Sequence, residues 1–141
     1  MKIAVMDGQG GGIGATIIKA IRERLGHTIE VLALGTNSIA TSRMMKAGAN
    51  RGATGENAIV RTSADVDWIV GPLSIVLADS MMGELSPAMA SAVSSSPAKK
   101  ILIPLTQEEV IVVGMKPEPL PHLVEEAVGV IESERGGLSD V

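Results

Sequence analysis

Asp7 directly follows the apolar run 3–6, and five glycines lie within the next seven residues, 8–14, before a helical pattern at 15–25. A strand, a glycine turn and a helix in this order bring backbone N–H groups and the positive end of a helix up to a phosphate. Each glycine can adopt a positive φ, allow the backbone to approach a ligand closely, or allow the helix to pack closely on the strand. The pattern predicts an anion-binding loop but does not indicate which reaction, if any, the protein catalyses. A βα turn without a ligand is the alternative, because glycine motifs also occur in plain turns.

The spacing G-x-x-x-G-x-G of Gly8, Gly12 and Gly14 resembles the cofactor turn of short-chain dehydrogenases. A dinucleotide site also needs an acidic residue about 20 positions further on, at the end of the second strand, to hold the adenosine ribose. The second apolar run, 29–34, is followed by Gly-Thr-Asn-Ser, with neither a carboxylate nor an arginine. That family also relies on a tyrosine near a lysine, and this chain has no tyrosine. A short-chain dehydrogenase in the usual sense is therefore not expected.

The composition favours one globular domain with an aliphatic core. The chain has 141 residues, of which 45% are hydrophobic and 20% charged, which is the size and balance of a single domain. Phe and Tyr are absent and Trp68 is the only aromatic residue, so Ile, Leu, Val, Ala and eight Met must fill the core. Such strands suit a parallel sheet that is buried on both faces.

The same composition excludes several classes of site and partner. The absence of cysteine excludes disulfides, thiolate chemistry and cysteine-based metal sites, and the two histidines exclude a histidine-rich one, so no metal-binding residues are assigned. A net charge of −4 and few aromatics argue against nucleic acid as a partner. The sequence shows neither a signal-peptide layout nor an apolar run of membrane-spanning length. We therefore expect a cytoplasmic protein that does not contact the membrane.

Short apolar runs alternate with helical patterns, which is typical of βαβ units. We predict a three-layer Rossmann-like α/β sandwich whose mostly parallel sheet has five to six strands. Only four residues separate the run 99–104 from 109–114, and a parallel crossover needs a dozen or more, so these two runs are predicted to form an antiparallel edge hairpin. The region 55–64 is predicted as a helix after a short strand at 48–51, with a strand at 58–60 as the alternative. Further strands are predicted at 29–34 and 67–71, and further helices at 38–46, from 87 and at 120–132. Residues 1–135 are expected to form the single domain and 136–141 a flexible tail.

Ligands of parallel α/β sheets bind outside the carboxyl ends of the strands, and the loops predicted there are rich in Gly, Thr, Ser and Asn. These residue types suit hydrogen bonds to phosphate oxygens, although they are also ordinary helix caps and turn formers. Asp7 and Glu56 are the candidate catalytic carboxylates, and each also has a structural role open to it, Asp7 as a cap of the glycine turn and Glu56 as an acid facing a helix dipole. The candidate cofactor-binding residues are Gly8, Gln9, Gly10, Gly11, Gly12, Ile13, Gly14, Gly35, Thr36, Asn37, Thr54, Gly55 and Asn57.

Two family resemblances rest on these segments. From the glycine-rich start through 33–37, 52–60 and 119–123, the chain resembles an uncharacterised bacterial family catalogued as a domain of unknown function. That resemblance covers nearly the full length and implies no activity. The order of Asp7, then 34–37, then 52–57 before a helix is also similar in layout to methylglyoxal-synthase-like domains. This second resemblance implies a small phosphorylated substrate, Asp7 as the base, and Gly35, Thr36, Thr54 and Gly55 as the phosphate cradle. The chain departs from it in the glycine-dense first turn and in lacking the expected active-site histidine.

Three hypotheses about function follow. The first is a nucleotide-binding or dinucleotide-binding domain that holds NAD(P) or another nucleotide on residues 8–14, with oxidoreductase chemistry as an option. The second is a lyase or isomerase that acts on a small phosphorylated metabolite with Asp7 or Glu56 as base. The third is a non-catalytic module that senses a ligand, for which the Met-rich stretches at 44–45 and 81–82 offer an adaptable surface. The expected partner is a small phosphorylated or nucleotide ligand, and a homodimer is a further option.

Overall fold

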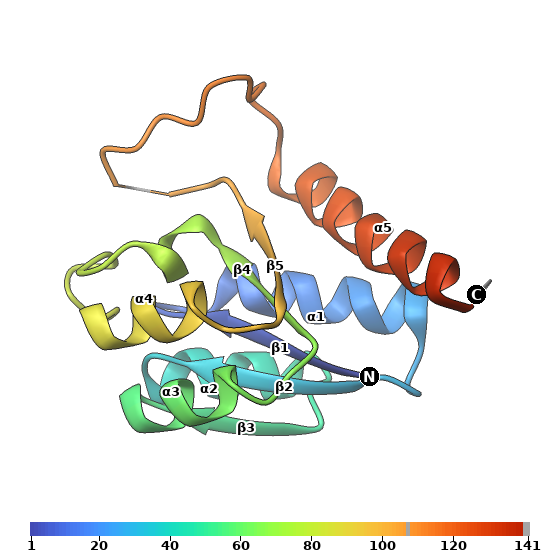
Figure 1. Cartoon of the computed structure of the whole chain (residues 1–141), viewed down its shortest axis with the longest axis horizontal. Coiled ribbons are helices and arrows are strands. Elements are labelled where there is room, and N and C mark those ends of the chain that lie inside the picture. The colour runs from blue at the N-terminus through green and yellow to red at the C-terminus, as the bar shows by residue number, and fades with distance from the viewer. Residues whose placement is uncertain (107, 140–141) are drawn as a thin grey trace.

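A computed structural model describes residues 1–106 and 108–139. Five parallel strands form one sheet in the order β3-β2-β1-β4-β5, with helices on both faces (Figure 1). The predicted Rossmann-like α/β architecture is confirmed. The strands are β1 (Lys2–Asp7), β2 (Glu30–Gly35), β3 (Arg51–Thr54), β4 (Trp68–Pro72) and β5 (Lys99–Ile103), and the helices are α1 (Gly12–Leu25), α2 (Ser38–Lys46), α3 (Glu56–Ser63), α4 (Pro87–Ser94), α5 (Leu120–Ser139) and the short 3₁₀ helix η1 (Leu73–Val76).

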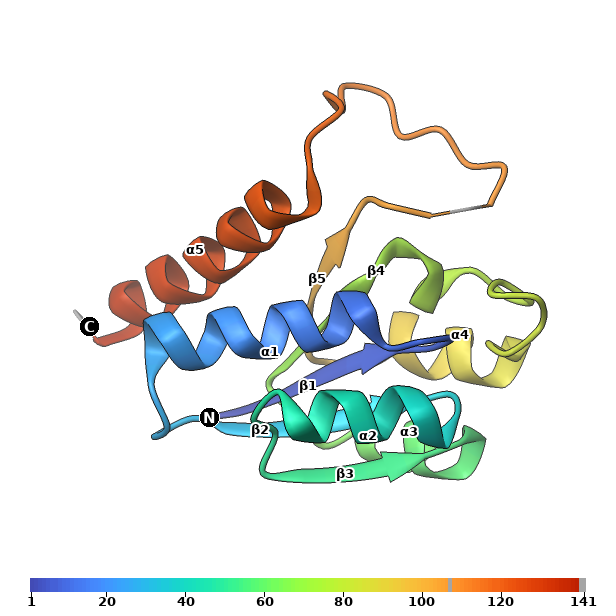
Figure 2. The same cartoon turned by 180° about the vertical axis from the view of Figure 1, so that it is seen from behind.

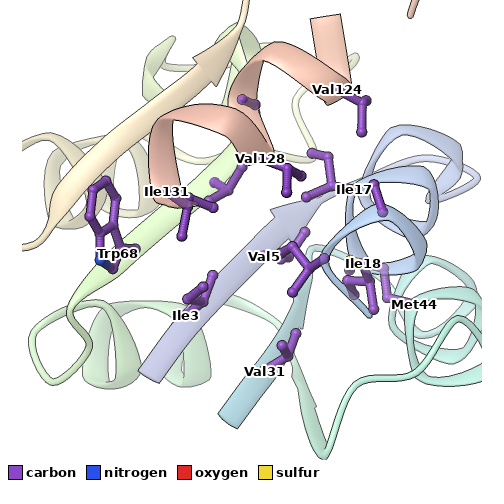
Figure 3. Close-up of a cluster of buried hydrophobic side chains, with 14 of the residues drawn as sticks. Ile3, Val5, Ile17, Ile18, Val31, Met44, Trp68, Val124, Val128 and Ile131 are labelled. Carbon is purple, nitrogen blue, oxygen red and sulfur yellow. The ribbon is translucent and has the colours of Figure 1, made fainter. Parts of the chain in front are cut away.

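Alternation along the strands divides the core into two layers. In β1, Ile3 and Val5 point to one face of the sheet and Ala4 and Met6 to the other, and all four are fully buried. The first face packs against α1, α2 and α5, where Ile17, Met44 and Val128 belong to the same cluster (Figure 3). The second face packs against α3, η1 and α4. Burial on both faces of β1, β2 and β4 explains the near-continuous apolar runs at these strands.

The strand order determines which helices lie on which face. The chain runs outward from β1 to β3, then returns past β1 to β4 and β5. Because crossovers between parallel strands are right-handed, reversing the direction of travel moves the connecting helices to the opposite face. Accordingly α1 and α2 lie on one side of the sheet and α3 and α4 on the other, as the view from behind shows (Figure 2). Neighbouring strands β1 and β4 are therefore the point at which the order reverses.

Helix α5 returns to the face that α1 covers and extends further than the predicted 120–132. Arg24 of α1 donates to Glu125 at 3.0 Å and to Glu132 at 2.9 Å, so one guanidinium holds two turns of α5. The last turn covers 136–139, which the sequence predicts as part of a flexible tail; residues 140 and 141 of that tail lie outside the described residues.

Residues 55–64 are mostly helical, as predicted: α3 begins at Glu56 after Gly55, whose φ of 97° suits glycine.

The predicted antiparallel edge hairpin is wrong, because the described residues of 109–114 form no strand. The chain leaves β5 toward the carboxyl ends of the strands instead. There the Thr106 hydroxyl lies 3.1 Å from that of Ser74, and Glu108 Oε1 accepts a hydrogen bond of 3.0 Å from the Met81 backbone N–H. These contacts direct the following segment away from β5, and the orange segment of Figure 1 accordingly runs far from the sheet before it returns to α5.

Candidate functional site

The crevice at the reversal of strand order contains a cavity of about 260 Å³. In open α/β sheets this crevice, outside the carboxyl ends of the strands, is where ligands bind. Its walls come from the glycine turn after β1, from the segment after β4, and from the segment after β5. They comprise Asp7, Gln9, Ile13, Pro72, Ser74, Met81, Leu105, Thr106 and Glu108. Sequence elements far apart along the chain thus meet at one cavity.

The glycine turn is a tight one, shaped by packing and by backbone conformation. Gly11 has φ of 74° and caps α1, and its N–H donates to the Gly8 carbonyl at 2.9 Å. A Cβ on Gly8 would lie 2.5 Å from both Met81 Sδ and Thr36 Oγ1, and one on Gly14 would lie 2.5 Å from Met44 Sδ. The fold itself requires Gly11, because its φ is positive and a Cβ there would lie 2.8 Å from the Ala40 Cα. A side chain at Gly8 or Gly14 would require the neighbouring side chains to shift.

Gly10 and Gly12 have no such packing requirement. A Cβ on Gly10 would meet the Arg43 guanidinium at 3.8 Å, and one on Gly12 would meet it at 3.4 Å. Arg43 reaches the turn from α2 and donates to the Gly10 carbonyl at 3.3 Å. The outer face of the turn therefore combines two glycines with room for a close ligand, the amino end of α1 and a cation.

Asp7 caps α1 from inside the molecule. Its side chain is 5% exposed, and its carboxylate accepts hydrogen bonds from the Gly8 N–H at 2.8 Å and the Gly14 N–H at 2.7 Å. Burial raises the pKa of Asp7 above its ordinary value, more than these backbone hydrogen bonds lower it, and the negative charge of Glu84 raises it further. A buried carboxyl group with a raised pKa in a cavity can exchange a proton nearer to neutral pH than an ordinary aspartate can.

Glu84, which no sequence pattern marks, joins the loop after β1 to the loop after β2. Its Oε1 accepts hydrogen bonds from the Thr36 hydroxyl at 2.7 Å, the Gln9 backbone N–H at 2.8 Å and the Asn37 side-chain amide at 2.8 Å. Although its partial burial raises the pKa of Glu84, the hydrogen bonds from Thr36, Gln9 and Asn37 outweigh that effect and lower the pKa. These three residues, which the sequence predicts to bind the ligand, therefore donate to the carboxylate of Glu84.

Unusual backbone conformations gather around the cavity. Among the described residues, four that are not glycine have positive φ: Gln9 at 50°, Asp79 at 64°, and Met81 and Met82 at 56° each. Gln9 belongs to the glycine turn, and the other three belong to the loop between η1 and α4 that carries Glu84. Side chains other than Gly, Asn and Asp rarely adopt this conformation, and such residues concentrate at functional sites. The two loops that carry them both contribute to the cavity wall.

The remaining predicted residues lie at the same edge of the sheet but outside the cavity lining. The Gly55 N–H donates to the Gly35 carbonyl at 2.9 Å, and the Thr54 hydroxyl lies 2.7 Å from that of Thr41. Glu56 accepts a hydrogen bond from Ser86, the N-cap of α4, and Asn57 is exposed. The structure therefore brings Asp7, Gln9 and Ile13 to the cavity, and it does not bring Glu56 there.

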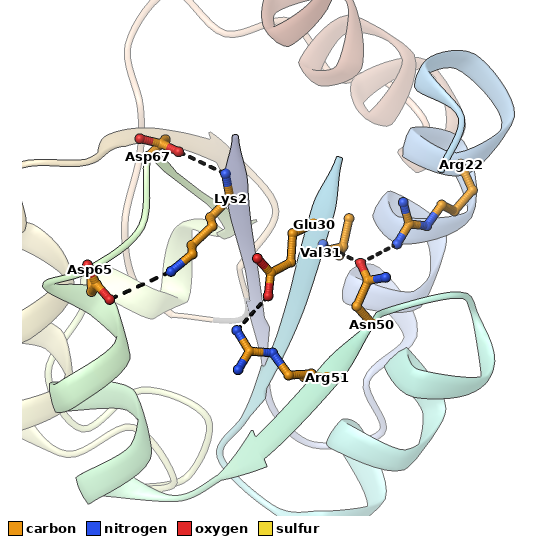
Figure 4. A network of polar contacts seen from close by, with 8 residues as sticks. All are labelled: Lys2, Arg22, Glu30, Val31, Asn50, Arg51, Asp65 and Asp67. Atoms are coloured by element: carbon orange, nitrogen blue, oxygen red, sulfur yellow. Dashed lines mark hydrogen bonds and ion pairs between the residues drawn. The ribbon is translucent and has the colours of Figure 1, made fainter. Parts of the chain in front are cut away.

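A second cavity, of about 370 Å³, lies between β2, β3 and α3. Three of the charged residues that line it, Lys2, Arg51 and Asp65, belong to a surface network (Figure 4). Arg51 pairs with Glu30, Lys2 Nζ lies 3.8 Å from Asp65, and the Lys2 backbone N–H donates to Asp67. Lys2 and Arg51 are the first residues of β1 and β3, so this network lies at the amino ends of the strands. Its position is opposite to the ligand-binding edge of α/β sheets.

The described residues hold no cluster of three or more His, Asp or Glu side chains arranged to bind a metal ion. None of the helices described here combines the length and apolar character needed to cross a membrane.

The model of the family described as "Domain of unknown function (DUF3842)" matches residues 2–135. The chain belongs to this family. The resemblance inferred from the sequence to a domain of unknown function is thus confirmed. A search of curated proteins finds no match. Among solved structures, the chain is similar to a dodecameric FMN-dependent UbiX-like decarboxylase from Escherichia coli O157:H7, with 16% identity, a TM-score of 0.54, and coverage of 96% of this chain and 95% of that chain. That likeness concerns the fold.

Replacing Glu84 with glutamine tests the electrostatic contribution of this carboxylate. The folded-state pKa of Glu84 lies below 4.5, so its charge stabilises the fold above that pH, and the contribution is lost as pH falls through the lowered pKa. Wild type should therefore exceed Glu84→Gln in free energy of unfolding at neutral pH, and the gap should close in acid. Urea denaturation across pH measures this, with Glu23→Gln on the exposed face of α1 as the control. A difference in unfolding free energy that does not change with pH would contradict a stabilising charge on Glu84.

Proposed function

We propose that this protein binds a phosphorylated, nucleotide-like ligand in the crevice between β1 and β4, with flavin mononucleotide as the first candidate. The observation that carries the proposal is the cavity of about 260 Å³ directly against the glycine turn, at the point where the strand order reverses. Ligand pockets usually measure about 300–1,000 Å³, so this cavity would hold part of such a ligand and leave the phosphate end outside.

The outer face of the glycine turn supplies the chemistry for that phosphate. Gly10 and Gly12 permit a close approach, the amino end of α1 carries a partial positive charge, and Arg43 lies beside both glycines. The backbone N–H groups of Gly14 and Gln9 already donate to Asp7 and Glu84, so the outer face of the turn is the place left for the phosphate. Inside the cavity, Ile13, Pro72 and Leu105 offer apolar contacts for a planar ring, and the Ser74 and Thr106 hydroxyls offer polar ones.

Flavin mononucleotide fits this arrangement better than NAD(P) does. NAD(P) sites hold the adenosine ribose with an acidic residue, or its 2′-phosphate with an arginine, at the end of the second strand. Here β2 ends at Gly35, and Thr36 and Asn37 follow with their side chains bonded to Glu84. A flavin mononucleotide has one phosphate and no adenosine, so it needs no such residue. The similar fold belongs to a protein described as FMN-dependent.

A thermal-shift comparison of flavin mononucleotide, NAD, NADP and small sugar phosphates tests the proposal. A ligand that binds only the native state stabilises it by roughly 2.7 kcal/mol at 100 times its dissociation constant, which is readily detected. We expect the largest shift with flavin mononucleotide. A shift with NAD or NADP alone would replace the candidate ligand, and no shift with any of these compounds would remove the proposal.

The variant Gly12→Val tests the binding position. The Cβ of the valine would meet only the Arg43 guanidinium, at 3.4 Å, so we expect a change in unfolding free energy below about 1 kcal/mol. The valine side chain would occupy the place of the phosphate, so affinity for flavin mononucleotide should fall at least about tenfold, or 1.4 kcal/mol. Ser133→Val, on the exposed side of α5, is the control and should bind like wild type. Unchanged affinity in Gly12→Val would exclude the outer face of the turn.

A second candidate function, a lyase or isomerase acting on a small phosphorylated metabolite, is favoured by Asp7. That residue lines the cavity, is buried, and has a raised pKa, as a group that transfers protons at an active site would. The methylglyoxal-synthase-like layout gives Asp7 the same role. Under this candidate a sugar phosphate would shift the melting temperature and be turned over, whereas a sensing module would bind a ligand without turnover.

A further inference from the structure

The segment 109–116, here called the arm, exposes a run of apolar residues at 110–113. The exposed fractions of Val110, Ile111, Val112 and Val113 are 40%, 91%, 44% and 94%. This alternation is the pattern of a β-strand, and the residue types are strong strand formers. Yet the arm belongs to no sheet. A strand-forming apolar run that is left unpaired on a surface is normally covered by another chain.

The surface that matches the arm is the open edge of β5. Among the described residues this strand pairs only with β4, so its other edge carries unpaired backbone groups. A cavity of about 440 Å³ lies between β5 and α5, with residues 101–104 of the β5 side and residues such as Leu123 and Ala127 of α5 in its wall. The end of the arm, at 114–116, lines the same cavity. In the six-stranded Rossmann order 3-2-1-4-5-6, the position beside β5 is that of a sixth strand. Here that position is empty of strands from the described chain.

Charge and chain length together specify the pairing. A parallel alignment that sets Val110 beside Ile101 also sets Glu109 beside Lys100. The antiparallel alignment about the same pair sets Glu109 beside Leu102 and Lys100 beside Ile111, so it leaves both charges facing apolar side chains. The Lys100 ammonium bonds to the Ser96 carbonyl and retains further donors. Parallel pairing within one chain requires a crossover of a dozen or more residues, and only residues 104–108 separate β5 from the arm. A parallel partner for the arm must therefore come from another molecule.

We propose that the arm adds to the β5 edge of a second copy of this chain as a parallel sixth strand. Each copy carries one arm and one open edge, so a reciprocal exchange gives a dimer, and a head-to-tail exchange gives a ring where its rotation closes. The contacts of Thr106 and Glu108 with Ser74 and Met81 fix the base of the arm at the candidate ligand site. The arm of each copy thus links that site to the neighbouring subunit.

Sedimentation velocity over a range of protein concentrations tests the proposal with the full chain. Wild type should form a discrete oligomer, and the double variant Ile111→Lys with Val113→Lys should be monomeric. Both side chains are over nine-tenths exposed, so the variant should retain the circular dichroism spectrum of the wild type. Ile39→Lys, which alters another exposed isoleucine on α2, is the control and should associate like wild type. Monomeric wild type, or an oligomer that the double variant leaves intact, would overturn the proposal.

Thiol crosslinking tests the register. The chain has no cysteine, so Ile101→Cys and Val110→Cys each introduce a single thiol. After the two variants are mixed and allowed to exchange subunits, mild oxidation should yield a covalent dimer containing one chain of each kind. Facing residues on adjacent strands satisfy the Cα separation that a disulfide requires. Mixed dimers no more abundant than in a mixture of Val110→Cys with Ile39→Cys would exclude the parallel pairing.

Discussion

The variant Gly35→Ala should destabilise the protein by about 3 kcal/mol, which is the upper part of the usual range for overpacking. An added Cβ at Gly35 would lie 2.1 Å from Thr41 Oγ1 and 2.7 Å from both the Asn37 carbonyl oxygen and the Thr41 backbone nitrogen. The backbone atoms belong to the start of α2 and its N-cap, so relief requires that the helix move off β2. Urea denaturation should report the loss as a lower transition midpoint.

Gly10→Ala is the matched control for this prediction. Gly10 is exposed, and the Cβ of its alanine would meet only the Arg43 guanidinium at 3.8 Å. Its unfolding free energy should lie within about 0.5 kcal/mol of wild type, as for other surface substitutions. Equal effects in the two variants would show that close packing of α2 is not what requires glycine at position 35. The expected difference separates glycines that the fold requires from glycines that leave room for a ligand.

The variant Asp7→Ala should lower the unfolding free energy by about 2 kcal/mol at neutral pH, because it removes the acceptor of two buried N–H groups. These donors are the backbone amides of Gly8 and Gly14, at 2.8 Å and 2.7 Å from the carboxylate. Asp65→Ala is the control, because Asp65 is an exposed residue whose carboxylate lies 3.8 Å from Lys2 Nζ, a surface ion pair worth little. A loss in Asp7→Ala no larger than that in Asp65→Ala would contradict the role of Asp7 as an internal cap.

The Asp7 effect should also depend on pH in a defined direction. The pKa of Asp7 in the folded state lies above its ordinary value of 3.8, so folding favours the protonated form. The associated stability is fully present below 3.8 and is lost as pH rises through the raised pKa. The difference between wild type and Asp7→Ala should therefore be largest in acid and decrease toward neutral pH. This is opposite to the direction expected for Glu84, so denaturation of both variants across pH distinguishes the two carboxylates.

Much of the fold follows from local patterns in the sequence. The glycine turn after the first apolar run, the helix 38–46 and the helix that starts at Pro87 could be predicted because each depends on residues within a few positions. The edge hairpin could not, because tertiary contacts of Thr106 and Glu108 redirect the chain after β5. Loop length alone allowed a hairpin, and partners distant in sequence prevented it.

The candidate site is less accessible to sequence analysis than the fold. Asp7, Gln9 and Ile13 were found because they belong to the motif itself. Glu84 was missed because it reaches Gln9, Thr36 and Asn37 from a loop about 50 to 75 positions away, and a glutamate in an irregular segment carries no periodic signal. The neighbouring Gly83 indicates a turn and does not indicate a binding site. Gly35 shows the reverse case, a glycine of the predicted cradle that packing alone explains.

The most direct test of the central claim is a titration of ¹⁵N-labelled protein with flavin mononucleotide, followed by the amide resonances. The proposed crevice predicts saturable shifts of the Gly10 and Gly12 amides, with further shifts at Ser74 and Thr106 across the cavity. The Gly26 amide, at the opposite end of α1, should not move. Saturable shifts confined to other parts of the chain, or a spectrum that flavin mononucleotide leaves unchanged, would contradict binding between β1 and β4.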